Sequence, residues 1–252
     1  MNPALLLLTD SRLPAGGHAH SGGTEQAIAT GAVHDLTSLA AFLRGRLHTS
    51  GHVAAALAAA ACALGANRSS DTSWDLLDAE ADARTASPAQ RAASRTQGRL
   101  LLRVARRLWP PPTLDDLAPG VPSPRRSVAL DGLAQAVPNP HHPIALGAAA
   151  HAAGASPEDA ALAAAYHAIT GPATAAVRLL GLDPVAVHGL LADLTPDLAT
   201  TASDATSSDL ATSACDTSPY GGSWAELPAR SAPALDLLAE RHAEATVRLF
   251  VS

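Results

Sequence analysis

The sequence predicts an all-α fold, built as a single helical-bundle domain. Hydrophobic residues make up 47% of the 252 residues and aromatic residues only 3%, and alanine alone supplies about half of the apolar content. Alanine is the strongest helix former and buries little area, so a core of alanine and leucine must come from close packing of helices. This length allows one large core, and no internal repeat divides the chain, so residues 1–252 form one predicted domain.

Local signals place the helices of the first half. Gly31 closes the second helix, Asp35 or Thr37 caps the third, and Gly65 ends an alanine-rich fourth. Trp109 followed by three prolines stops the longest one. The predicted helices here are 4–8, 21–30, one running to 47, 53–64, 71–85 and 88–108.

The second half continues in the same way. The run Ser156-Pro157-Glu158-Asp159 has the cap, the proline and the acidic first turn of a helix start, and Gly171-Pro172 is expected to break the helix that follows. Helices are predicted at 127–136, 144–153, 156–169, 173–180, 183–194 and 233–250.

A segment rich in Ser, Thr and Asp, residues 195–226, is predicted to be a disordered loop. It holds almost no large apolar residue before Trp224, so it cannot offset the entropy cost of ordering. Deletion of residues 200–220 is therefore expected to change stability very little.

Charge and cysteine content exclude several classes. The net charge is −6 and no basic block is long enough for a nucleic-acid footprint. Cys62 and Cys215 lie too far apart to suggest a disulfide framework or a zinc ribbon. No secretory signal and no uninterrupted membrane-spanning stretch is found, so the chain is expected to be soluble and cytoplasmic.

Histidine pairs are the candidate metal ligands. His18 and His20, two residues apart in a turn, could share a cation such as nickel or zinc, with His141 and His142 completing the site. The alternative is a polar loop with unrelated histidines, since no Cys, Asp or Glu stands at ligand spacing beside either pair. His48 and His52 form a weaker candidate, because Gly51 lies between them.

No catalytic set and no cofactor motif is found. Ser21 lacks the glycine two residues earlier that a nucleophile elbow requires, and the nearby glycines match neither a Walker A loop nor a dinucleotide-binding turn. Glu25 lies in the first turn of the helix that Ser21 is predicted to cap. Its carboxylate either stabilises the helix start or makes a functional contact.

The C-terminal segment is a candidate recognition site. Arg241, His242, Glu244 and Arg248 are expected on one helix, where Glu244 and Arg248 have the i, i+4 spacing of an ion pair. A solvated charged face is the alternative reading. Leu249 and Phe250 favour recognition, because they place apolar side chains where a solvated end is usually polar.

These two ends resemble the UreF family of urease accessory proteins. The family's opening pattern, L-P-x-G-x-(aromatic)-x-x-S-x-G-x-E, is matched by Leu13, Pro14, Gly16, Ser21, Gly23 and Glu25. Its closing pattern, A-R-H-x-x-x-x-R-L-F-x-S, corresponds to Arg241, His242, Arg248, Leu249, Phe250 and Ser252, with Glu240 in place of the alanine and one extra residue between the histidine and the second arginine. The chain departs from the family at His18, Thr24 and Val251, and in a reduced arginine-rich middle helix.

The resemblance implies an all-helical, non-catalytic assembly factor without a cofactor. Members dimerise, bind the accessory protein UreD (also called UreH) through a surface that includes the C-terminal end, and recruit the GTPase UreG for nickel delivery to the urease apoprotein. If Glu25 faces the GTPase, Glu25→Gln should weaken UreG recruitment and leave UreD binding intact. Two other functions remain open: a GTPase activator supplying Arg248 or Arg178 as an arginine finger, and a nickel carrier using His18 and His20.

Overall fold

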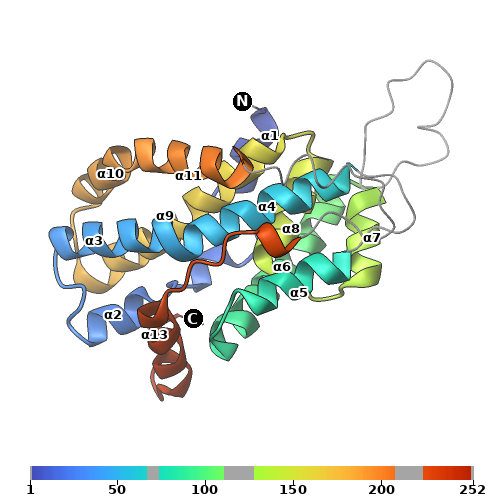
Figure 1. Cartoon of the computed structure of the whole chain (residues 1–252). Helices are drawn as coiled ribbons and strands as arrows, with labels where there is room; N and C mark the ends of the chain where they lie inside the picture. The colour runs from blue at the N-terminus through green and yellow to red at the C-terminus, as the bar shows by residue number, and fades with distance from the viewer. Residues whose placement is uncertain (1, 67–73, 111–127, 208–223, 251–252) are drawn as a thin grey trace, which may run out of the picture.

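A computed structural model describes residues 2–66, 74–110, 128–207 and 224–250 (Figure 1). Within these residues the regular elements are helices and there is no strand, which confirms the predicted all-α class. The α-helices are α1 Pro3–Thr9, α2 Thr24–Ala29, α3 Leu36–Arg46, α4 His52–Gly65, α5 Trp74–Ala83, α6 Pro88–Leu108, α7 Val128–Ala136, α8 His142–Ala152, α9 Pro157–Leu180, α10 Pro184–Asp193, α11 Thr195–Ser207 and α13 Pro233–Glu244.

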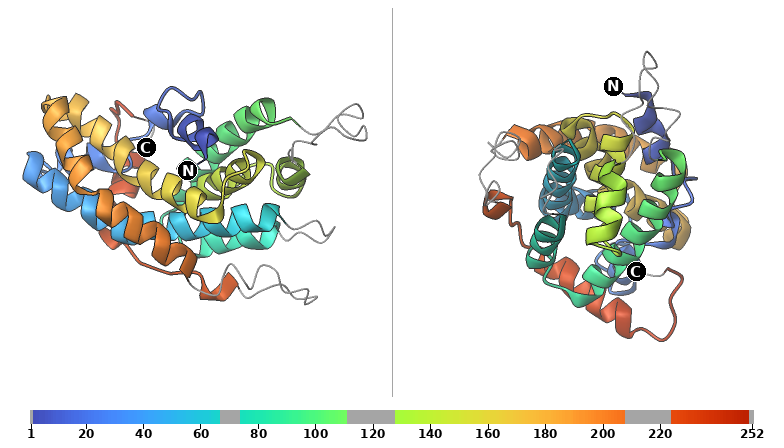
Figure 2. Two further views of the ribbon diagram at one scale, coloured as in Figure 1. Left: turned by 90° about the horizontal axis from the view of Figure 1, so that it is seen from above. Right: turned by 90° about the vertical axis from the view of Figure 1, so that its right-hand side faces the viewer.

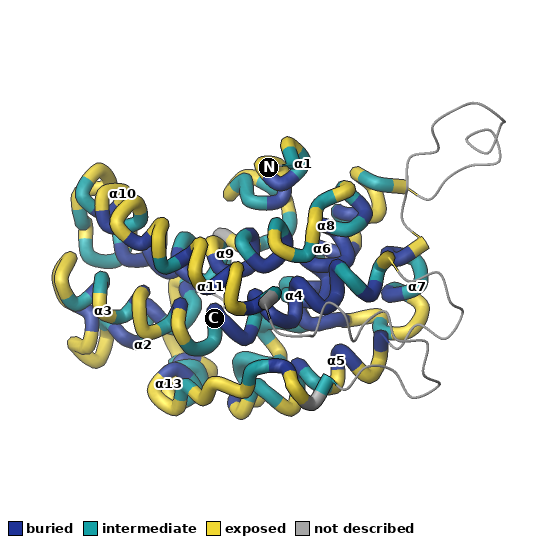
Figure 3. The backbone as a smooth tube through the Cα atoms, turned by 45° about the horizontal axis from the view of Figure 1, so that its top comes forward, coloured by how far each residue is buried: buried dark blue, intermediate teal, exposed yellow. Residues whose placement is uncertain are grey.

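Helix α4 lies at the centre of the bundle, where it packs mainly against α8 and α9. Figure 3 shows buried backbone concentrated along α4 and α8 and exposed backbone on the peripheral helices. Nearly every residue of α4 is buried, and most are alanines. Small side chains on all faces allow helices to approach α4 from several directions, which is how an alanine-rich chain builds a core.

The crossing of α4 and α8 brings the two backbones into direct contact at Gly147. A Cβ on Gly147 would lie 2.2 Å from the carbonyl oxygen of Ala58 and 2.7 Å from the Cβ of Ala61. Only glycine fits at this point, because any side chain would force the two helices apart.

The sequence predicted α3 and α4 as two separate helices. In the structure they are continuous, because one π-helical turn, Leu47–Gly51, joins them. The continuous stretch Leu36–Gly65 is long and apolar enough, by length and composition alone, to cross a membrane. Of its most apolar window, 72% is buried inside the bundle, so packing in the core accounts for its composition.

The predicted break at Gly171-Pro172 does not occur, because α9 continues through Pro172. Proline has no N–H to donate to the carbonyl of the residue four positions earlier, which is Ala168. Nε of Arg46, at the end of α3, donates to that carbonyl oxygen at 2.8 Å. A side chain from another helix thus replaces the missing backbone hydrogen bond, and Figure 2 shows α9 running unbroken beside α3, α4 and α11.

The prediction of a disordered loop over residues 195–226 is wrong for its first part, residues 195–207. Residues Thr195–Ser207 form α11, which packs on α9 and α4. Leu198, Thr201, Ala202 and Ala205 are buried, and their spacing makes a narrow stripe that fits against other small residues. Deleting residues from 200 onward would therefore remove packed helix, whereas residues 208–223 lie outside the described part of the chain.

The last predicted helix, 233–250, extends too far. Helix α13 ends at Glu244, and Ala245 is already extended, with φ −66° and ψ 132°. The segment after α13, which includes Arg248, Leu249 and Phe250, is therefore not helical, and its backbone turns back toward α2. The predicted i, i+4 pair of Glu244 and Arg248 does not exist, because no helix joins them.

Candidate functional site

The carboxylate of Glu25 holds the C-terminal segment, residues 245–250, by its backbone. Oε1 of Glu25 accepts a hydrogen bond from the N–H of Leu249 at 2.8 Å, and Oε2 accepts one from the N–H of Phe250 at 3.1 Å. The Glu25 side chain is only 15% exposed. Two motifs more than two hundred residues apart in sequence therefore meet in one structure.

His242 closes the same arrangement from the last turn of α13. Its Nδ1 lies 3.7 Å from Oε2 of Glu25, and its Nε2 donates to the carbonyl oxygen of Phe250 at 3.3 Å. His242 is 3% exposed, so its ring faces the interior of the molecule. Together, Glu25 and His242 fix the path of the backbone after α13.

The fixed segment presents apolar side chains to solvent. Val247 is 83% exposed and Leu249 76% exposed, while Arg248 is exposed between them and Phe250 is half-buried. Exposed apolar groups on a backbone held by hydrogen bonds are typical of a recognition surface, since little order has to be gained on binding. We call Val247, Arg248 and Leu249 the C-terminal ridge.

The other predicted site residues separate into two groups. Arg241 and Glu244 are exposed on α13, beside the C-terminal ridge. Ser21 is buried and is not the N-cap of α2; that position is Gly23, which has φ 89° and makes no side-chain cap. The turn before α2 therefore relies on the left-handed conformation that glycine adopts easily.

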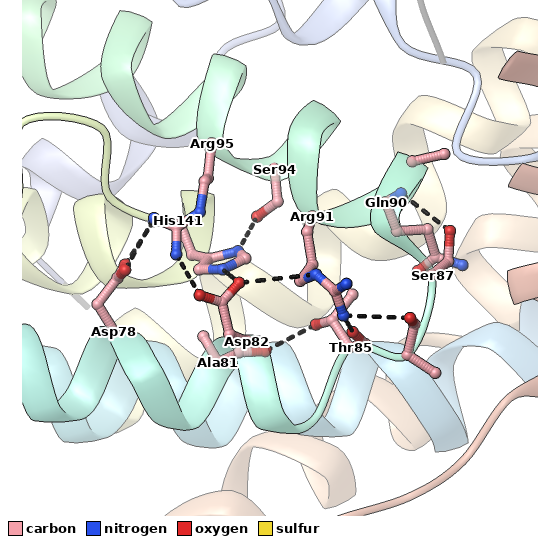
Figure 4. A network of polar contacts seen from close by, with 12 residues as sticks. Asp78, Ala81, Asp82, Thr85, Ser87, Gln90, Arg91, Ser94, Arg95 and His141 are labelled. Carbon is pink, nitrogen blue, oxygen red and sulfur yellow. Dashed lines mark hydrogen bonds and ion pairs between the residues drawn. The ribbon is translucent and has the colours of Figure 1, made fainter. Parts of the chain in front are cut away.

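A second polar cluster joins α5, α6 and the start of α8 (Figure 4). Arg95 donates to Asp78 at 2.8 Å and to Asp82 at 2.5 Å, and Asp78 also accepts the backbone N–H of His141 at 2.8 Å. The His141 ring contacts Ser94 at 3.0 Å and Asp82 at 2.9 Å. Burial would raise the pKa of Asp82, yet hydrogen bonds from His141 and Arg95 hold it below its usual value.

This cluster is the one group of three potential metal ligands among the side chains that the structure describes, formed by Asp78, Asp82 and His141. The guanidinium of Arg95 already lies between both carboxylates, and a cation would have to displace it. The cluster therefore fits a structural ion-pair network better than a metal site. The signal that could have found it is the spacing of Asp78 and Asp82 on one helix and of Arg91 and Arg95 on the next.

The predicted histidine ligands do not form such a group in the described part of the chain. His18 lies in the 3-10 turn Gly17–Ala19, and its side chain is outside the described residues. His20 is buried and lies near His142, whereas His141 belongs to the Arg95 network. His48 is exposed and His52 is buried, and neither belongs to a three-ligand group within the described chain.

Comparison with known proteins identifies the family. The UreF family model matches residues 33–195, which is more than half of the chain. The chain is 42% identical over 250 residues to the urease accessory protein UreF of Mycolicibacterium vanbaalenii, covering 98% of this chain and 97% of the relative. It is 41% identical to the protein of that name from Mycobacterium marinum and 39% identical to the one from Mycobacterium tuberculosis, each over 248 residues with the same coverage. With this extent of similarity, and with both end motifs meeting at Glu25, the chain belongs to the UreF family of urease accessory proteins.

Proposed function

We propose that this protein is a non-catalytic scaffold for nickel incorporation into the urease apoprotein, bridging a UreD/UreH-type accessory protein and the GTPase UreG. Nickel would be cargo of the assembly and not a resident cofactor. The protein would act in the cytoplasm as a homodimer. The family relationship supports a role in urease maturation, and the absence of a recognisable catalytic motif in the sequence is compatible with it.

The observation that carries the proposal is the C-terminal ridge. Its two apolar side chains, Val247 and Leu249, project from a segment whose backbone is tied to Glu25. Arginine is enriched among the residues that contribute most to protein interfaces, and Arg248 lies between these two apolar side chains on a backbone that is already ordered. The UreD-type protein is the partner that the family resemblance assigns to this end of the chain.

Glu25 takes a different part in the proposal than the sequence suggested. Its carboxylate faces the C-terminal segment, so its first effect is on the path of residues 245–250. We therefore expect Glu25→Gln to weaken binding of the UreD-type partner. A selective loss of UreG recruitment, with UreD binding intact, would instead support the earlier expectation.

Co-purification with UreD, UreG and the urease apoprotein tests the scaffold. Leu249→Asp places a charge in the middle of the C-terminal ridge and should remove the UreD-type partner from the complex. The matched control is Val185→Asp, because Val185 is 77% exposed on α10, away from this surface. Equal recovery of the partner with both variants would contradict the assignment of the ridge.

The arginine-finger alternative rests on Arg248 and Arg178, which are both exposed. A finger accelerates GTP hydrolysis by roughly 10³–10⁵-fold. Stimulation of UreG turnover on this scale, lost in Arg248→Ala or Arg178→Ala, would replace the scaffold by an activator. Stoichiometric nickel binding by the isolated protein would favour the carrier instead.

A further inference from the structure

A cavity of about 420 Å³ lies next to the C-terminal ridge, enclosed by parts of α4, α6, α8, α9 and α13. This volume is within the range of about 300–1,000 Å³ that is usual for small-molecule sites. Part of the wall is apolar and is formed by side chains such as Val53, Leu57 and Leu235. The cavity is separate from the Arg95 network, which touches it only through Ser94 and His141.

The wall carries basic side chains and no acidic ones, and its positive charge at neutral pH comes from Arg46 and Arg248, because burial lowers the pKa of His142 to about 3 and that of His167 to about 4. Among the lining residues there is no Asp or Glu, whereas the basic ones are Arg46, Arg248, His141, His142, His167 and His242. The whole chain has a net charge of −6, so this wall differs in sign from the average surface. A wall that combines low-dielectric surroundings with positive charge concentrates anions.

Arg46 contributes a half-buried positive charge to this wall, from the end of α3. Its Nε and Nη1 each donate one hydrogen bond, to the carbonyl oxygens of Ala168 and Gly22, both at 2.8 Å. No carboxylate of the described residues pairs with it, and the remaining N–H groups of the guanidinium have no hydrogen-bond acceptor there. Burial lowers the pKa of Arg46 to about 10, which still leaves it charged at neutral pH. A half-buried cation without a counter-ion is costly, and an anion beside it would offset that cost.

The other basic groups divide into occupied and available donors. The His141 ring is engaged by Ser94 and Asp82. The His242 ring is engaged by Phe250 and Glu25.

His142 lines the cavity and its ring makes no hydrogen bond within the described chain. Arg248 lines the same cavity and is exposed, so it lies where the cavity meets solvent. His167, the remaining basic residue of the wall, donates a hydrogen bond to the backbone of Leu8, so Arg46, Arg248 and His142 are the groups left to bind a ligand.

We propose that this cavity is a binding site for an oxyanion of the phosphate type, held by Arg46 and Arg248 with His142 as a further donor. The planar guanidinium fork matches two oxygens of such an anion at once. A tetrahedral oxyanion offers enough oxygens for two forks and an imidazole N–H, whereas a carboxylate offers two. The apolar part of the wall leaves room for an organic body attached to the anion.

Calorimetric titration of the full chain with inorganic phosphate, at constant ionic strength, tests the proposal. We expect saturable one-to-one binding with half-saturation below about 10 mM. Acetate, titrated in parallel, should bind more weakly. Absence of saturable phosphate binding, or tighter binding of acetate, would overturn the proposal.

Two variants with matched controls locate the site. Arg46→Gln should weaken phosphate binding by about tenfold or more, because it removes the half-buried charge. Its control is Arg44→Gln, since Arg44 lies on the same helix but pairs with Asp197 at 3.3 Å. Arg46 also supports α9, so Arg248→Gln provides a second test that does not disturb a helix. Arg248→Gln should weaken phosphate binding without lowering the melting temperature. The exposed control Arg241→Gln should change neither quantity. Unchanged affinity in both Arg46→Gln and Arg248→Gln would refute the site.

Discussion

Replacing Glu25 by glutamine tests whether this carboxylate fixes the C-terminal segment. The native carboxylate accepts two backbone N–H groups, at 2.8 and 3.1 Å, and a glutamine amide has only one acceptor oxygen. Hydrogen bonds to a charged group contribute about 1.5–3 kcal/mol each, so losing one should destabilise the segment by about this amount. Since about 1.4 kcal/mol is a factor of ten, hydrogen exchange at Leu249 and Phe250 should become roughly ten- to a hundredfold faster.

Hydrogen exchange followed by NMR or mass spectrometry measures this effect. The control is Glu244→Gln, which removes an exposed carboxylate at the end of α13 and should leave both amides unchanged. Exchange in α4 should be the same in all three proteins, because the effect is local. Unaltered exchange at Leu249 and Phe250 in Glu25→Gln would refute the reasoning, and so would an equal rise throughout α4.

Three further predictions concern stability. Gly147→Ala should lower the midpoint of urea denaturation strongly, because the new Cβ would lie 2.2 Å from a carbonyl oxygen of α4. The control is Gly45→Ala, whose new Cβ would have no other atom within 4 Å; this change should be neutral or stabilising by up to about 1 kcal/mol. Arg95→Ala should also reduce the free energy of unfolding, because it leaves the Asp78 carboxylate, which is 6% exposed, without its cation. A melting temperature equal to that of the wild type would contradict a stabilising role of the Arg95 network. Burial lowers the pKa of His142 to about 3 and that of His167 to about 4, below the unfolded value of about 6.5. The unfolded chain then binds more protons, so stability should fall as the pH drops from about 6.5 toward 4, by up to about 1.4 kcal/mol per pH unit for each histidine. Thermal melts against pH measure this slope, and replacing either histidine by glutamine should reduce it.

Local signals were sufficient for the helices that begin and end on short-range interactions. Of the two caps predicted for α3, Asp35 or Thr37, the structure has Asp35, which accepts the N–H of Ser38. Ser156 caps α9, as predicted, by accepting the N–H of Asp159. Proline and glycine signals placed the ends of α4 and α6 within a few residues. These interactions join residues that are neighbours in sequence, so a pattern can reveal them.

The errors arise where a distant group decides the outcome. Pro172 should break α9, but Arg46 from another helix satisfies the carbonyl that the proline leaves free. Helix α11 has no strong apolar pattern, yet small side chains are enough because α4 and α9 also present small residues. In both cases the missing information is the identity of the neighbour, which a local pattern does not contain.

The C-terminal segment shows the same limit and separates two roles within one motif. Continued helical spacing through Leu249 and Phe250 suggested a longer helix, whereas their N–H groups pair with Glu25. Glu25 and His242 thus build the segment, and Val247, Arg248 and Leu249 are the side chains it exposes. If this division is right, Leu249→Asp should weaken partner binding while exchange at Phe250 stays unchanged, and Glu25→Gln should alter both. Loss of partner binding in Glu25→Gln with native exchange at Phe250 would mean that the carboxylate itself contacts the partner.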